Sequence, residues 1–115
     1  MSEECKEELV KEALNAIRGA LMAYLKVSCK KSLRIIRLTG QKRLRVDFYG
    51  LFNYYDPTDN FPRFMDAYSY AVKCVGQEKV NEVLEGEVIE GGDTGHQIAI
   101  PSERYEELCK QLGEA

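Results

Sequence analysis

The sequence is poor in the residues on which many metal and redox sites depend. Its 115 residues include no Trp, one His and four Cys. The cysteines, Cys5, Cys29, Cys74 and Cys109, are too widely spaced for a zinc knuckle, and one His cannot complete a Cys/His ligand set. We therefore predict no metal, no cofactor and four reduced thiols. The alternative is an intracellular disulfide, which proteins of hyperthermophiles do use.

Long apolar runs are also missing. The longest nearly apolar run covers residues 20–25, far short of the roughly 20 residues that a membrane span needs. The acidic, polar N-terminus resembles neither a signal peptide nor a transit peptide. We expect a cytoplasmic protein with no membrane partner. Abundant Lys, Arg and Glu favour a thermophilic source.

Length and composition indicate a globular chain. With 44% hydrophobic and 30% charged residues, the chain falls within the range of globular proteins and outside that of disordered ones. Its length predicts a single domain over residues 1–115.

Apolar side chains recur at helical spacing over residues 3–28, which predicts a long amphipathic helix. Within it, Ala16, Gly19, Ala20 and Ala23 form a small-residue face. Such a face suits close packing inside one chain or a helix–helix contact in a homodimer. The sequence leaves both open.

Two strands are predicted next, over 33–39 and 43–49, joined as a hairpin around 39–42. The second alternates apolar and polar residues, which is typical of a strand with one buried face. In the first, Ile35 and Ile36 are adjacent. A β-bulge there would let Arg34 and Arg37 share one face. A short third strand over 51–55 and a turn over 56–60 complete this region.

The remaining segments predict helices and a second hairpin. One helix is expected from about Phe61 to the break at Gly76, and a helical segment over 77–85. A hairpin over 87–90 and 97–100 follows, around a Gly-rich turn at 91–95, and a last helix starts at Ser102. The order α-β-β-(β)-α-β-β-α indicates the α+β class, with helices packed on an antiparallel sheet.

Acidic side chains are absent between Glu12 and Asp47, whereas nine Lys or Arg lie there. A row of cations on a hairpin can contact phosphates and release counterions, and nearby tyrosines can stack on unpaired bases. We therefore predict a non-catalytic nucleic-acid-binding module, RNA or DNA being its partner. The predicted site residues are Lys30, Lys31, Arg34, Arg37, Lys42, Arg43, Arg45, Tyr49, Tyr54 and Tyr55.

The overall charge of −3 favours a second interpretation. Nucleic-acid-binding domains are usually basic overall, and acidic segments at both ends of this chain could neutralise the hairpin. The alternative function is a dimeric protein-binding adaptor or chaperone-like domain whose basic hairpin meets an acidic protein.

Three weaker candidates remain. An enzyme could use His96 as a general base oriented by Asp93, although a Gly-rich hairpin turn explains that loop more simply. Cys29 lies among lysines, which would favour its thiolate. Glu78, Glu82 and Glu85 share a helix face and are expected to be solvated.

Overall fold

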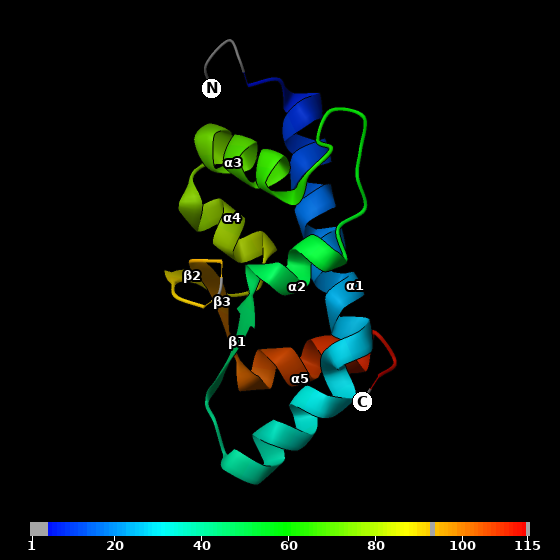
Figure 1. Ribbon diagram of the computed structural model, residues 1–115, viewed down its shortest axis with the longest axis vertical. Helices are drawn as coiled ribbons and strands as arrows, with labels where there is room; N and C mark the ends of the chain where they lie inside the picture. Colours follow the sequence, from blue (N-terminus) through cyan, green and yellow to red (C-terminus); the bar gives the residue numbers. More distant parts are fainter. Residues whose placement is uncertain (1–4, 93, 115) are drawn as a thin grey trace.

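The fold is organised around one long helix. The computed structural model describes residues 5–92 and 94–114, and its first helix, α1 (Glu7–Thr39), has 33 residues. At about 1.5 Å per residue such a helix is about 50 Å long, which matches the 49 Å longest dimension of the molecule. Helix α3 packs beside the first half of α1 and α5 beside its second half (Figure 1).

Seven shorter elements follow α1 in the described part of the chain. They are β1 (Arg43–Asp47), α2 (Phe48–Asn53), α3 (Phe64–Val75), α4 (Gln77–Val83), β2 (Glu87–Glu90), β3 (His96–Pro101) and α5 (Ser102–Gln111). Strand β3 lies between β1 and β2 and is antiparallel to both. Leu44 and Val46 lie opposite Ile100 and Ile98, and all four are buried on the inner face of the sheet. Helices on an antiparallel sheet confirm the predicted α+β class.

The strand predicted over 33–39 is wrong, because this segment is the last part of α1. Leu25, Cys29 and Leu33 recur every fourth residue and are buried, so the helical period continues beyond residue 28. The helix ends at Gly40, which has φ +67° and donates its N–H to Ile36 O at 2.8 Å, a common helix end. The basic β-hairpin therefore does not form.

The third strand predicted over 51–55 is also wrong. Helix α2 begins directly after β1, and the Asp47 side chain caps it by accepting a hydrogen bond from Tyr49 N at 2.9 Å. A Cβ atom at Gly50 would lie 2.6 Å from the Tyr24 ring. Glycine thus allows α2 to lie close against α1.

The second half of the chain follows the predicted pattern more closely. Helix α3 begins at Phe64, three residues after its expected start, and Gly76 separates it from α4. The β2–β3 hairpin and the start of α5 at Ser102 are confirmed. The expected start of the first helix at residue 3 lies outside the described residues.

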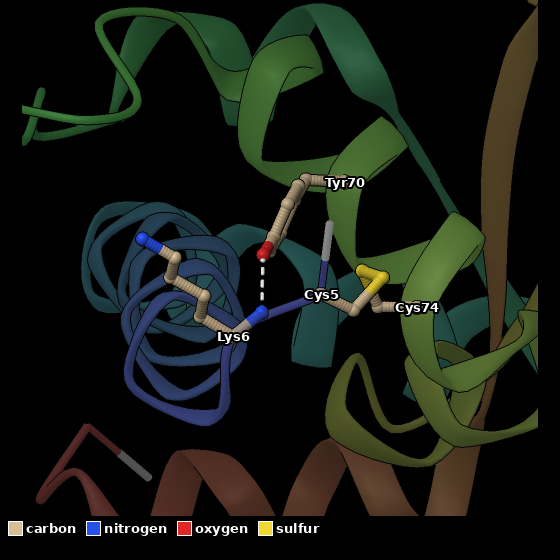
Figure 2. The surroundings of a disulfide bond; sticks show 4 residues. All are labelled: Cys5, Lys6, Tyr70 and Cys74. Carbon is tan, nitrogen blue, oxygen red and sulfur yellow. Dashed lines mark hydrogen bonds between the residues drawn. A yellow bond between two sulfur atoms is a disulfide. The ribbon is translucent and has the colours of Figure 1, made fainter. Parts of the chain in front are cut away.

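The cysteines form two disulfides, so the prediction of four reduced thiols is wrong. Cys5 is bonded to Cys74 and ties the start of α1 to the end of α3. Beside this bond, Lys6 N donates a hydrogen bond to the Tyr70 hydroxyl at 3.0 Å (Figure 2).

The second bond joins Cys29 of α1 to Cys109 of α5, and both residues are fully buried. Cys29 is therefore no reactive thiolate. The two bonds attach α1 to α3 at its start and to α5 at Cys29, ten residues before its last residue, Thr39.

Candidate binding surface

The predicted site residues fall on three different elements. Lys30, Lys31, Arg34 and Arg37 lie on the last turns of α1. Lys42 is in the connection that follows, Arg43 and Arg45 are on β1, and Tyr49 is on α2, with Tyr54 and Tyr55 directly after that helix. All seven cations are exposed. These cations are presented by the end of α1 and by the edge strand β1, and not by the predicted hairpin.

Three of these cations line one hollow at the end of α1. Lys30, Arg34 and Arg37 surround a groove of about 580 Å³ together with Leu33, Leu38 and the C-terminal residues Gly113 and Glu114. We call it the basic groove. Positions 30, 34 and 37 are about one helical turn apart, so the three charges extend over about 10 Å along one side of α1. Arg37 also complements the negative end of the helix dipole.

Six of the seven predicted cations have no carboxylate partner in the described residues. Arg43 pairs with Glu87 at 3.7 Å across the outer face of the sheet. The remaining six, Lys30, Lys31, Arg34, Arg37, Lys42 and Arg45, have no carboxylate oxygen within 4.0 Å in the described part of the chain. The charges of this region are thus open to an external anion.

Glu85 is held by two arginines that lie outside the basic groove. Glu85 accepts hydrogen bonds from Arg104 at 2.8 and 2.9 Å and from Arg18 at 3.0 Å. These bonds, from Arg104 first, lower its pKa despite partial burial. Its backbone has φ +62°, a region that favours glycine. Glu85 therefore joins α1 to α5 through Arg18 and Arg104. The expectation that Glu85 shares a solvated acidic face with Glu78 and Glu82 is wrong.

Arg43 and Arg45 lie apart from the lining of the basic groove. Both point to the outer face of the sheet, since Arg45 lies opposite Ala99 whereas Leu44, between them, is buried opposite Ile100. The long basic row expected from the sequence is thus divided into a helix part and a sheet part.

The tyrosines differ in how far they are available. Tyr49 is 59% exposed and Tyr54 40%, with the Tyr54 ring edge-on to Tyr24. Tyr55 instead donates its hydroxyl to Phe61 O at 2.6 Å and packs its ring edge-on against Phe64. Burial raises the pKa of the Tyr55 phenol. Tyr55 is a packing residue, so Tyr49 and Tyr54 remain as stacking candidates.

Exposed apolar side chains accompany the cations, and the sequence interpretation missed them. Val27 is 61% exposed and Leu38 79%, and Ile35 is 37% exposed. Positions 27, 31, 34 and 38 fall on one side of a helix. Helical spacing extended through residue 39 therefore places Val27 and Leu38 on the same side of α1 as Lys31 and Arg34.

The Gly-rich loop is a hairpin turn in the residues described around it. Gly91, Gly92 and Gly95 have positive φ, and Gly91 N donates to Gly95 O at 3.1 Å. The His96 ring stacks on Phe48 with centroids 5.4 Å apart. Asp93, the other half of the enzyme alternative, lies outside the described residues.

Among the described residues, no helix combines the length and the apolar content that crossing a membrane requires. Comparisons of the chain with protein-family models, with curated proteins and with solved structures found no match. The function is therefore argued from this fold and its charged surface.

Proposed function

We propose that this protein is a non-catalytic binding module that contacts nucleic acid through the basic groove and the cations beside it. The observation that carries the proposal is the absence of carboxylate partners, in the described residues, for six exposed cations of a chain with net charge −3. Unpaired cations hold counterions, and phosphates that replace these ions release them into solution.

The geometry suits phosphate contacts better than base reading. Arg34 and Arg37 can each donate two parallel hydrogen bonds to a phosphate, and Lys30 supplies a point charge on the same side of the helix. Tyr49 and Tyr54 offer exposed rings for unpaired bases. Binding with little sequence preference is the expected behaviour.

Fluorescence anisotropy of labelled single- and double-stranded oligonucleotides tests the proposal. Affinity should fall steeply between about 50 and 200 mM salt, because each neutralised phosphate contributes a slope of roughly 0.7 to 0.9. The double substitution Arg34→Glu with Arg37→Glu should abolish binding at the lower salt concentration. An unchanged affinity would contradict the role of the groove.

The matched control carries Arg63→Glu with Lys79→Glu. Both residues are exposed cations outside the groove, each paired with a carboxylate three residues further along, so the change in net charge is the same. This control should retain most of the affinity. Equal losses in both variants would mean that net charge, and not the groove, controls binding.

A protein partner is the second candidate, and the exposed Val27 and Leu38 favour it. Apolar side chains beside cations suit an acidic protein surface or a second copy of this chain. Analytical ultracentrifugation at low and high salt decides. A dimer that becomes monomeric on Leu38→Glu would support this alternative. A monomer at every salt concentration would exclude a second copy of the chain as the partner.

We also propose that the protein is located in the cytoplasm. Two disulfides in a cytoplasmic protein are typical of hyperthermophiles, so location and thermophilic source are linked here. Fractionation of the source cells tests the location directly, and recovery of the protein outside the cytoplasm would refute it.

A further inference from the structure

A second hollow shares no lining residue with the basic groove. It is formed by the end of α2, the connection over 54–63 and the first turn of α3. Its volume is about 480 Å³, and its lining is Phe52, Tyr55, Pro57, Pro62, Arg63, Phe64, Met65 and Asp66. Small-molecule pockets have volumes of about 300–1,000 Å³ and mostly apolar walls. We call it the aromatic pocket.

The rings of the pocket continue the aromatic cluster of the core. Phe64 is 2% exposed, and its ring centroid lies 5.4 Å from that of the buried Phe48. On the pocket side, Phe52 and Tyr55 have their centroids 5.7 and 5.9 Å from Phe64. Phe52 remains 39% exposed. A further ring in the pocket would cover Phe52 and make edge or offset contacts of the kind that aromatic pairs prefer.

The two charged side chains of the lining, Arg63 and Asp66, pair with each other. The Tyr55 hydroxyl donates to Phe61 O at 2.6 Å. Arg63 donates from Nε and Nη2 to the Asp66 carboxylate at 3.2 and 3.3 Å. An ionised ligand would therefore lose hydration without finding an uncompensated opposite charge, which favours a neutral ligand.

The wall formed by residues 54–63 is held in place before any ligand binds. Thr58 and Phe61 exchange two backbone hydrogen bonds. The Thr58 hydroxyl donates to Glu12 of α1 at 2.7 Å, and the Asn60 amide donates to the same carboxylate at 3.0 Å. A wall tied to the longest helix loses little conformational entropy when a ligand binds.

We propose that the aromatic pocket binds a neutral aromatic small molecule of two or three rings. A closed cavity of about 150 Å³ holds one benzene ring, and this open pocket is about three times as large. The site is independent of the basic groove, because neither its lining nor its ligand depends on the groove's cations.

The probe for the test is N-phenyl-1-naphthylamine, which is neutral and gains fluorescence in apolar surroundings. The oxidised, unmodified protein should bind it saturably, with an affinity that changes less than about twofold between 50 and 500 mM salt, since no charge pair forms. A steep salt dependence, or no saturable signal, overturns the proposal.

Phe52→Ala removes one wall of the pocket and should weaken binding about tenfold or more, whereas Tyr49→Ala should leave it unchanged. Tyr49 is the matched control, being an aromatic on the same helix that is more exposed and outside the pocket lining. Equal losses in the two variants would indicate adsorption to exposed rings and overturn the site.

Backbone amide shifts in the unmodified protein provide a second test that needs no variant. On titration of the probe, the largest shifts should fall on residues 52–55 and 63–66. Shifts centred on α1 or on the sheet would overturn the proposal even if Phe52→Ala failed to fold.

Discussion

Reducing the two disulfides should destabilise this protein strongly. Cys5–Cys74 and Cys29–Cys109 join residues 69 and 80 positions apart. For loops of this length the chain-entropy relation assigns each bond about 4 kcal/mol at 25 °C. For a 115-residue chain, 1 kcal/mol corresponds to about 4 °C in Tm, so losing one bond should lower the Tm by about 15 °C.

The two bonds should differ in accessibility more than in loop length. Cys29 and Cys109 are fully buried, whereas Cys5 is 8% exposed and Cys74 half-buried. A mild reductant should therefore open Cys5–Cys74 first, and Cys29–Cys109 should open only when the protein unfolds. Replacing the buried pair by alanine should also cost more, because it leaves a cavity between α1 and α5.

Guanidinium denaturation, followed by circular dichroism, measures these differences for the oxidised protein, the reduced protein and each double Cys→Ala variant. Alkylation of the denatured, unreduced protein, with mass spectrometry, provides the control for bond formation. Labelling of all four cysteines under those conditions would refute the pairing. Identical midpoints for oxidised and reduced protein would refute the estimated stabilisation.

Two further predictions concern the α4–β2 connection. Gly86→Ala would place a Cβ 2.5 Å from the Ala99 carbonyl oxygen, and we expect it to cost about 1–3 kcal/mol by overpacking; an unchanged denaturation midpoint would contradict this. Glu85→Gln should weaken the bonds to Arg104 and Arg18. Because folding lowers the pKa of Glu85, its stabilising effect is complete above the ordinary value of 4.5 and is lost as the pH falls through the folded pKa. The stability gap between native protein and Glu85→Gln should thus narrow from pH 7 to pH 3, and a constant gap would rule out this role.

The charge distribution has a physical consequence for the proposed binding. The net charge of −3 masks a charge of +9 between residues 13 and 46. Glu85 is held by Arg18 and Arg104, and Glu87 by Arg43, so these acids are not available to the basic groove. A polyanion approaching the end of α1 would meet local positive charge even though the whole chain is acidic.

Local patterns in the sequence were sufficient for much of the fold. The helical spacing up to residue 28, the glycine at position 76 and the Gly-rich turn predicted three features of the described residues. They are the first part of α1 from Glu7 onward, the break between α3 and α4, and the β2–β3 hairpin. Each of these signals depends on residues close in the chain, through side-chain periodicity or positive φ. The α+β class followed from their order.

The segment 33–39 shows where such patterns failed. The adjacent Ile35 and Ile36 fit a bulged strand or a helix, and the choice depends on where Leu33 and Cys29 are buried. Cys29 is bonded to Cys109 of α5, 80 positions away in the sequence, and Leu33 is buried in the same core cluster. A local sequence pattern carries no information on contacts of that range. Because these contacts bury one side of the segment against the core, residues 33–39 extend α1 and form no hairpin strand.

The sequence thus predicted which kinds of side chain are exposed, whereas the tertiary structure decided where they lie relative to one another. Composition and order along the chain predicted a cluster of exposed cations, and those cations are exposed and mostly unpaired in the described residues. Their arrangement and the pairing of the four cysteines arise from contacts between distant segments. The aromatic pocket is lined by one continuous stretch of chain, whose connection over 54–63 is held by Glu12 of α1. Long-range packing sets the arrangement and the pairing because burial of apolar area outweighs the weaker local preferences of a short segment.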